Sequence, residues 1–145
     1  MKKGKYLITG CAGFIGSSLV KKISNEYDLI LVDDLSSGSL KNIPKKLRRR
    51  LIKKKIQDLD RIKIKRLKGI FHLAAQPSVP LSLKNFYLSS TNNLVSSIKV
   101  FDLAKKFSVP VVYASSSAIY GHLPIGKDNI AKYSINSPYA QDKLT

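Results

Sequence analysis

The sequence of 145 residues has few cysteines and histidines and no long apolar run, the features that mark disulfide-bonded, metal-binding and membrane proteins. Its single cysteine, Cys11, excludes an internal disulfide and predicts a reducing compartment. Two histidines and one cysteine are too few for a zinc site. No apolar run reaches the ~18 residues that a membrane-spanning helix needs, and the Met-Lys-Lys start leads directly into the first predicted strand. These absences predict a soluble, cytoplasmic chain with no metal site and no membrane partner.

Acidic residues are also scarce. Nine Asp and Glu against 26 Lys and Arg give a formal net charge of +17, which would draw the chain to any polyanion. Much of this charge lies between Lys45 and Lys55, where Leu47 and Leu51 are four residues apart and allow one side of a short helix to dock. Aromatic residues and a recognised nucleic-acid-binding fold are missing there, so a solvated surface is favoured over nucleic-acid binding.

Strand and helix patterns alternate along the chain, which is typical of a parallel sheet covered by helices on both faces. A hydrophobic content of 43% is enough for one core and one domain, residues 1–145. The clearest helix is predicted from Asn92 to Lys106. Its apolar stripe comprises Leu94, Val95, Ile98 and Phe101. Strands are predicted at residues 5–9, 29–33, 52–57, 70–74 and 111–115.

A glycine-rich turn from Thr9 to Gly16 follows the first strand and precedes an amphipathic helix. Gly10 permits a sharp turn, Gly13 leaves room for a pyrophosphate, and Gly16 lets the helix pack close to the strand. The N-terminus of the helix then faces the phosphates. A turn without a ligand is the alternative, but the flanking strand and helix favour a dinucleotide site.

An acid follows the second predicted strand, about 20 residues after the glycine turn, where the ribose of a dinucleotide lies. The Asp33 carboxylate can accept hydrogen bonds from the 2′- and 3′-hydroxyls and would repel a 2′-phosphate, which favours NAD over NADP. Asp34 is either a second such acid or a loop and capping residue.

A Tyr-x-x-x-Lys spacing joins Tyr139 and Lys143 near the end of the sequence. Residues four apart share one face of a helix, so the Lys143 ammonium can lie near the Tyr139 phenol and a cofactor ribose. The ammonium favours the phenolate, which makes Tyr139 a candidate general base. This spacing is common in exposed helices, but here it follows a serine-rich strand end, Ser115 to Ser117, where open α/β sheets bind ligands.

Five ordered motifs resemble the extended short-chain dehydrogenase/reductase superfamily, and within it the NAD-dependent epimerase/dehydratase family that includes UDP-glucose 4-epimerase. They are residues 9–16, 32–38, 72–76 and 115–121, and Tyr139 with Lys143. The resemblance covers nearly the whole chain. It implies a Rossmann-type doubly wound parallel sheet, NAD as the cofactor and a nucleotide sugar, specifically a UDP-sugar, as the substrate.

The same resemblance implies roles for individual residues. Ser116 takes the place of the catalytic Ser/Thr, Tyr139 that of the base, and Lys143 that of its ribose-binding partner. Asp58 matches an acid that contacts adenine. His72 fits a strand-end histidine, for which packing is favoured over metal ligation. The implied cofactor-binding set is Gly10, Gly13, Phe14, Ile15, Gly16, Asp33, Asp34, Asp58, Leu59, Leu73, Ala74, Ala75, Gln76, Asn93, Tyr139 and Lys143.

The reaction implied by the resemblance is epimerisation. Related dehydratases carry an Asp-Glu pair just after the catalytic Thr, where this chain has Ser117 and Ala118, so elimination is disfavoured. In epimerisation Tyr139 would remove a sugar hydroxyl proton while hydride passes to NAD, and the hydride would return to the other face of the sugar. A dehydratase, decarboxylase or reductase of the same family is the alternative.

The predicted sheet stops at five strands, whereas a complete doubly wound sheet has six. We therefore expect the chain to be truncated before the sixth strand and the C-terminal substrate lobe of the family. Three hypotheses follow: an epimerase whose remaining half is supplied by another chain or lies in a part of the protein outside this sequence, a non-catalytic remnant that binds NAD weakly, and a basic protein that binds nucleic acid. The expected protein partner is a second copy in a homodimer or a complementing C-terminal chain.

Overall fold

A computed structural model describes residues 3–59, 64–124 and 133–145. The chain divides into two compact units. The first unit comprises Met1–Ala74 and Ser96–Tyr113, and the second comprises Ala75–Val95 and Ala114–Thr145. Among the described helices, none combines the length and the apolar character needed to cross a membrane.

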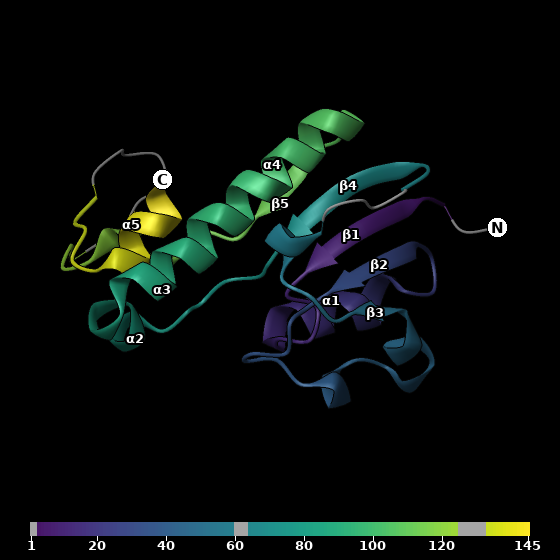
Figure 1. Ribbon diagram of the computed structural model, residues 1–145, viewed down its shortest axis with the longest axis horizontal. Coiled ribbons are helices and arrows are strands. Elements are labelled where there is room, and N and C mark those ends of the chain that lie inside the picture. The colour runs from purple at the N-terminus through teal and green to yellow at the C-terminus, as the bar shows by residue number, and fades with distance from the viewer. Residues whose placement is uncertain (1–2, 60–63, 125–132) are drawn as a thin grey trace. The chain divides into compact units, whose positions relative to one another are not determined.

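The first unit is built on a parallel sheet, in which the described residues form five strands in the order β3-β2-β1-β4-β5 (Figure 1). The strands are β1 (Lys5–Thr9), β2 (Asp28–Val32), β3 (Leu51–Ile52), β4 (Leu67–His72) and β5 (Val111–Tyr113). In the central strand β1, Leu7 lies opposite Ile30 of β2 and Ile70 of β4. The strand order changes direction between β1 and β4, and this switch point is where open α/β sheets bind ligands. The predicted α/β Rossmann-type sheet is confirmed.

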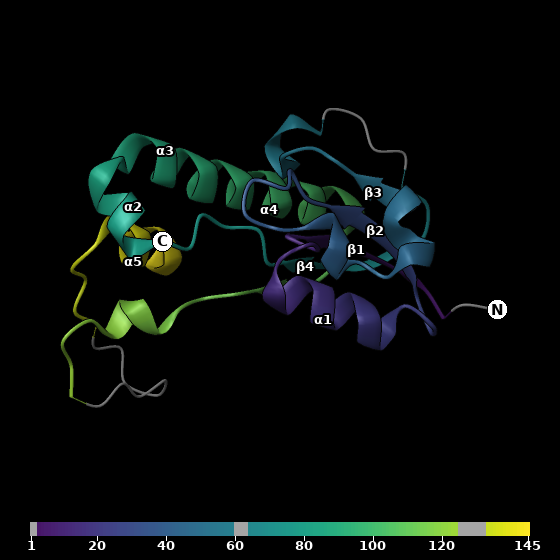
Figure 2. The same ribbon diagram turned by 90° about the horizontal axis from the view of Figure 1, so that it is seen from below.

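Two longer helices cover opposite faces of this sheet (Figure 2). They are α1 (Phe14–Ile23) and α4 (Ser96–Phe107), and shorter 3₁₀ turns lie at η1 (Leu40–Asn42), η2 (Lys45–Arg50) and η3 (Ile56–Asp58). Successive side chains of a strand point to opposite faces. Ile8 accordingly shares a core with Val20 of α1, and Leu7 shares a second core with Val100 of α4. The two cores hold the end of β1, and with it the glycine turn, in a fixed place.

The third predicted strand is wrong beyond its first residue. β3 ends at Ile52, and the N–H of Lys54 bonds back to the Ile52 carbonyl at 3.0 Å before η3 begins. Lys53 and Lys54 are both exposed, so this segment has no buried face on which a longer strand could pack. The fourth strand begins and ends earlier than predicted. Beyond its last residue, the N–H groups of Leu73 and Ala74 bond to the Thr9 hydroxyl, and that of Leu73 also bonds to the Thr9 carbonyl at 3.3 Å.

The helix predicted from residue 92 begins differently in the structure. A π-helical turn, η4 (Thr91–Val95), precedes α4. The predicted apolar stripe is not buried: Val95, Ile98 and Phe101 are 42%, 67% and 49% exposed. A π turn breaks the 3.6-residue phase, so a stripe counted across it does not continue along one face. The buried side chains of α4 are Ser96, Val100, Leu103 and Ala104.

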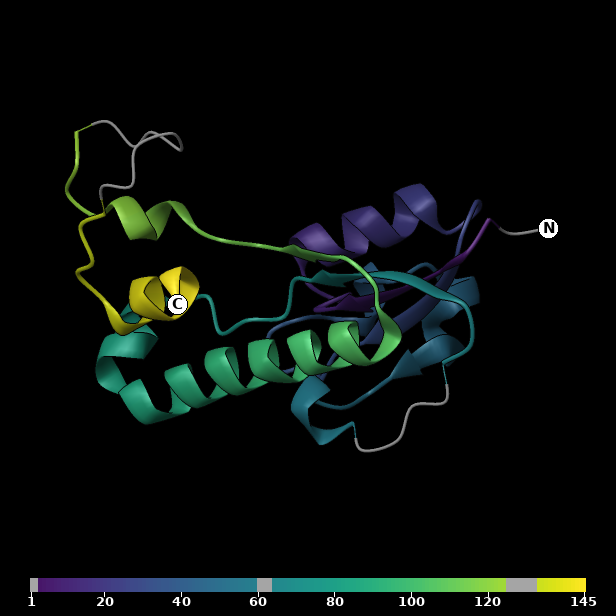
Figure 3. The ribbon, with the colours of Figure 1, turned by 90° about the horizontal axis from the view of Figure 1, so that it is seen from above.

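The second unit consists of short helical segments that pack on one another (Figure 3). In addition to η4 they are α2 (Val79–Lys84), α3 (Phe86–Ser90), η5 (Ser117–Tyr120) and α5 (Pro138–Leu144). Helices this short need caps and packing. The side chains of Ser78, Asn85 and Ser137 accept N–H groups from the first turns of α2, α3 and α5. In α5, Tyr139 and Lys143 are buried at 9% and 6% exposure.

Candidate cofactor-binding and catalytic residues

Two glycines of the turn are required by its own packing. Gly10 has φ +67°, and a Cβ on it would lie 2.6 Å from the Ala74 nitrogen and 2.7 Å from the Leu73 oxygen. A Cβ on Gly16 would overlap the Gly10 carbonyl oxygen. These contacts place β1, the start of α1 and the end of β4 against one another, as the sequence prediction for Gly10 and Gly16 requires.

Gly13 is different, because none of the residues that the structure describes requires a glycine there. Its φ is −75°, which any residue adopts, and a Cβ on it would meet only the Gly10 oxygen at an ordinary 3.4 Å. The space that a side chain would occupy is therefore open. A glycine at this position keeps that space empty, which fits a ligand that approaches the backbone closely, as the diphosphate of a dinucleotide does.

The N-terminus of α1 offers hydrogen-bond donors beside this open space. Gly13 is the N-cap and has no side chain to satisfy the first N–H groups, and no acidic residue lies in the first turn. The first four N–H groups of a helix lack partners within the helix and attract anions. Phe14 and Ile15, at this end of the helix, are 89% and 62% exposed. These features fit a bound diphosphate.

Asp33 has a structural role that sequence reasoning missed. Its carboxylate accepts the N–H of Ala12 in the glycine turn at 2.8 Å and the N–H of Leu35 at 2.9 Å, and its surface is 8% exposed. The end of β2 therefore holds the glycine turn in place. Asp34 accepts the N–H and the hydroxyl of Ser36 at 2.9 and 2.6 Å, which are the contacts of a loop acid.

Cys11 is fully buried inside the turn. Burial, and next the negative charge of Asp33, raise the pKa of its thiol to about 12. The side chain therefore stays a neutral thiol at physiological pH and fills space in the core beside α1, as a small apolar residue does.

The end of β4 is fixed by Thr9, a residue that the sequence analysis did not single out. Its hydroxyl accepts the N–H groups of Leu73 and Ala74 at 3.2 and 3.1 Å and lies 2.7 Å from Nδ1 of His72. The other ring nitrogen of His72 lies 3.2 Å from the Ser97 hydroxyl. These contacts are those of a packed histidine, and the described residues include no group of three or more potential metal ligands. A polar residue that ends an otherwise apolar strand was the available signal for Thr9.

Asp58, which is predicted to contact adenine, and Leu59, which is predicted to bind the cofactor, lie further along the first unit. Asp58 is exposed at the end of η3, and its N–H bonds to the Lys55 carbonyl at 3.1 Å. Leu59 is buried in the core on the α4 face. The exposed carboxylate of Asp58 leaves it accessible to a ligand, whereas the Leu59 side chain is used in packing.

The three predicted catalytic residues all belong to the second unit. The Ser116 hydroxyl caps η5 by accepting the Ala118 N–H at 3.2 Å. Helix α5, which carries Tyr139 and Lys143, packs against η5. The Lys143 ammonium donates to the carbonyl oxygen of Ala114 at 2.9 Å, two residues before Ser116. The structure therefore brings the elements that carry the serine, the tyrosine and the lysine together.

A buried polar network centred on Asn93 also contacts α5. The Asn93 side-chain oxygen accepts the Gln76 N–H at 2.8 Å, while its amide nitrogen donates to the Gln76 carbonyl at 3.3 Å and to Asp142 at 3.0 Å. Asn93 thus fixes the chain just after Ala75 as well as α5. Sequence reasoning identified Asn93 and Gln76 but missed Asp142, because an acid next to a lysine on a helix is typical of a solvated surface.

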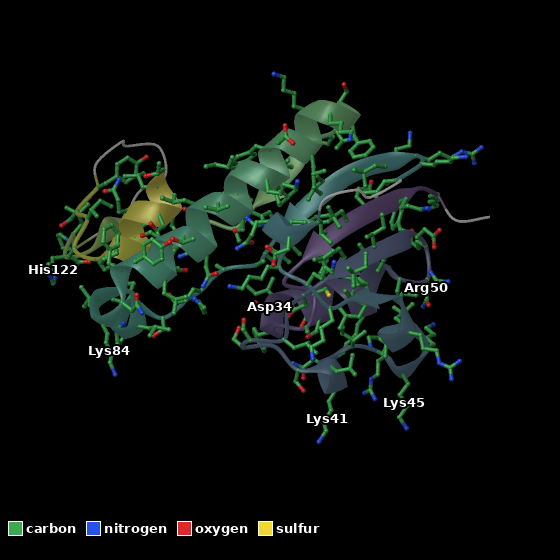
Figure 4. The ribbon with its side chains drawn as sticks, viewed as in Figure 1. Asp34, Lys41, Lys45, Arg50, Lys84 and His122 are labelled. Atoms are coloured by element: carbon green, nitrogen blue, oxygen red, sulfur yellow. The ribbon has the colours of Figure 1, made fainter. Side chains whose placement is uncertain are left out.

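The basic segment begins with a short 3₁₀ helix, η2, which ends at Arg50, so that Leu51 belongs to β3 and does not share a helix face with Leu47 as the spacing had suggested. Leu47 of η2 is 5% exposed and packs in the core on the α1 face. Around it, the side chains of Lys41 and Lys45 point away from the sheet (Figure 4). Arg50 forms an ion pair with Asp28 at 3.0 Å, with both side chains about half exposed. The segment is a docked, highly charged surface.

Comparisons with known proteins agree with this geometry. A family model described as the NAD dependent epimerase/dehydratase family matches residues 6–145. The UDP-glucose 4-epimerase of Mycolicibacterium smegmatis is 34% identical over 95% of this chain and 47% of its own length. This chain spans about half the length of the curated relatives that it matches.

Solved structures show the same likeness. The UDP-N-acetylglucosamine 4-epimerase of Methanobrevibacter ruminantium, in complex with UDP-N-acetylmuramic acid, is similar with a TM-score of 0.87 and 34% identity, over 99% of this chain and 48% of the other. The UDP-glucose 4-epimerase of Thermus thermophilus, in complex with NAD, is similar with a TM-score of 0.81 and 28% identity, over 96% of this chain and 47% of the other.

Proposed function

Because the chain belongs to the NAD-dependent epimerase/dehydratase family, we propose that it is the cofactor-binding part of a nucleotide-sugar epimerase that uses NAD and a UDP-sugar. The observation that carries this proposal is Gly13, whose missing side chain leaves open space beside the N-terminus of α1. Relatives named as 4-epimerases support the reaction class.

The first unit would hold the dinucleotide. Its diphosphate would meet the N–H groups of the first turn of α1, which no acidic side chain of that turn repels. Each oxygen of Asp33 accepts one backbone N–H, and a carboxylate oxygen has capacity for a second donor. Asp33 can thus hold the turn and accept ribose hydroxyls at once.

The second unit would carry the proton transfer. NAD, if bound here, would supply the acceptor and later the donor of the hydride. Tyr139 would take the proton of the sugar hydroxyl, and the Lys143 ammonium would favour the phenolate that does so. The Ser116 hydroxyl would hydrogen-bond the same sugar oxygen. Ser117 and Ala118 offer no acid that could protonate a leaving hydroxyl, which favours epimerisation over elimination.

Contacts that select the sugar are proposed to come largely from residues outside these 145, in the same chain or in another, because the relatives are about twice as long. A homodimer and a complementing chain are both compatible with this proposal.

Calorimetric titration of the 145-residue chain with NAD tests the proposal. Gly13→Val is a sharper probe than Asp33→Ala, because removal of the Asp33 carboxylate would also release the N–H groups of Ala12 and Leu35. We expect the chain to bind NAD, and Gly13→Val to bind it roughly tenfold more weakly or worse, which corresponds to about 1.4 kcal/mol. Ser18→Ala, an exposed change on α1, is the matched control and should bind as the unchanged chain does.

Two results would contradict the proposal. The first is equal affinity of Gly13→Val and the unchanged chain for NAD. The second is binding that is indifferent to the Gly13 change and falls steeply with salt, which would favour a polyanion-binding surface such as the basic segment. Titrations at two salt concentrations separate these cases.

A further inference from the structure

A buried acid lies directly beside the predicted catalytic lysine and has no part in the function proposed above. Asp142, in α5, is 3% exposed. Acidic residues are almost never fully buried unless they are paired. Within the described residues of the second unit, Asp142 is also the only carboxylate side chain. Its position therefore needs a physical reason.

The Asp142 carboxylate joins α5 to the helices beside it. One oxygen accepts the hydroxyl of Ser90, the last residue of α3, at 2.7 Å. The other oxygen accepts the amide of Asn93, in the π-helical turn η4, at 3.0 Å. Both donors are neutral, so they satisfy the oxygens and fix their place without cancelling the negative charge. That charge stays available to a neighbouring cation.

The neighbouring cation is Lys143, which is itself 6% exposed. Its ammonium donates to the Ala114 carbonyl, a neutral acceptor. Burial lowers the pKa of Lys143, and the charge of Asp142 opposes this shift. A buried ammonium with neutral acceptors alone would lose its proton more easily than one that also has a nearby carboxylate.

The other ionisable groups on the elements packed against α5 offer no comparable charge. They are Lys84 of α2, Tyr87 of α3 and Tyr120 of η5. Lys84 and Tyr87 are exposed, and η4 has no ionisable side chain. Among the described side chains around α5, Asp142 has the one carboxylate, and its charge acts on Lys143.

We propose that Asp142 is a positioning residue for Lys143: its carboxylate anchors α5 on α3 and η4, and its negative charge balances the buried ammonium. The functional consequence rests on the proposed function, because Lys143 has to remain protonated to favour the Tyr139 phenolate. Without the carboxylate, less negative charge opposes the desolvation of Lys143, and the lysine loses its proton at lower pH.

The test follows the Lys143 ammonium of the 145-residue chain by ¹⁵N NMR during a pH titration without NAD, with Lys143→Arg to assign the signal. Asp142→Asn keeps the shape of the side chain and removes its charge. We expect the acid dissociation constant of Lys143 to rise roughly tenfold in this variant. Asp102→Asn removes one charge from an exposed position on α4 and should leave the titration unchanged.

An unchanged Lys143 titration in a folded Asp142→Asn chain overturns the inference. If that variant does not fold, Asp142→Ser, which is smaller and also uncharged, answers the same question. Because NAD takes no part in the titration, the two proposals fail separately. A shifted lysine in a chain that does not bind NAD refutes the proposed function alone, whereas NAD binding with an unshifted lysine refutes this inference alone.

Discussion

The glycine turn allows a prediction that separates packing from ligand binding. A Cβ on Gly16 would overlap the Gly10 oxygen and lie 2.8 Å from the Gly10 carbonyl carbon and 2.9 Å from Cα of Cys11. Carbon atoms normally approach to about 3.5–4.0 Å. All three contacts are with backbone, so no flexible side chain can move aside, and the start of α1 has to shift away from β1.

The expected loss of stability for Gly16→Ala follows from two opposing effects. Overpacking of this kind costs about 3 kcal/mol. Alanine recovers up to about 1 kcal/mol because it favours a helix more than glycine does. The free energy of unfolding should therefore fall by about 2 kcal/mol, which lowers the melting temperature by roughly 6 °C in a chain of this size.

Gly13→Ala should behave differently, although it lies in the same turn. Its φ of −75° suits alanine, and the nearest atom to a Cβ is 3.4 Å away. Alanine lowers the entropy of the unfolded chain, which stabilises the folded state by about 0.4–1 kcal/mol. Alanine is also a poorer N-cap than glycine, which costs a few tenths to about 1 kcal/mol and offsets this gain. The free energy of unfolding should change by less than about 0.5 kcal/mol.

Urea unfolding followed by circular dichroism, without NAD, measures both variants against the unchanged chain. The midpoint of Gly16→Ala should fall, while that of Gly13→Ala stays near the original value at an equal slope. If Gly13→Ala loses as much stability as Gly16→Ala, the turn needs both glycines for packing. The role of Gly13 in keeping space free for a diphosphate would then be refuted.

Three further predictions concern stability. Ser108 has φ +50° at the end of α4, a conformation that favours glycine; its N–H bonds to the Lys105 carbonyl, and the N–H of Val109 bonds to the Ala104 carbonyl. Ser108→Gly should therefore raise the free energy of unfolding, measured in urea, by about 1 kcal/mol. The pKa of the Cys11 thiol, about 12 in the folded state, lies above its value in the unfolded chain, so between about pH 9 and 12 the folded state binds one more proton. The free energy of unfolding therefore falls as the pH rises through this range. Cys11→Ala should remove that part of the pH dependence in urea titrations. Leu47→Ala should lower the melting temperature, with a loss of about 2 kcal/mol, because Leu47 is the buried residue of η2.

The sequence predicted the centre of the sheet better than its edges. β1 and β2 are short apolar runs at the middle of the sheet, and their positions agree with the structure within one residue. The edge strand β3 was predicted too long, because Ile56 resembles a continuation of the strand although it packs from the 3₁₀ turn η3. A single apolar residue after three lysines does not reveal which element buries it.

The site was predictable where a motif has a local physical cause. Gly10 and Gly16 are needed at fixed spacings from a strand and a helix, so their roles follow from the sequence. The second role of Asp33, as the acceptor for the Ala12 N–H, depends on how β2 and the glycine turn meet across 21 residues of sequence. No local sequence pattern predicts that two segments this far apart in the sequence are in contact.

Asp142 shows the same limit more sharply. In sequence it is one acid beside one lysine, a pattern that on most helices means exposure to solvent. The Asp142 carboxylate is held by Ser90 and Asn93, which lie 52 and 49 residues earlier, at the end of α3 and in the π-helical turn that follows it. The candidate residues of the site are therefore predicted by their motifs, whereas the charge balance proposed for Lys143 follows from contacts that only the fold creates.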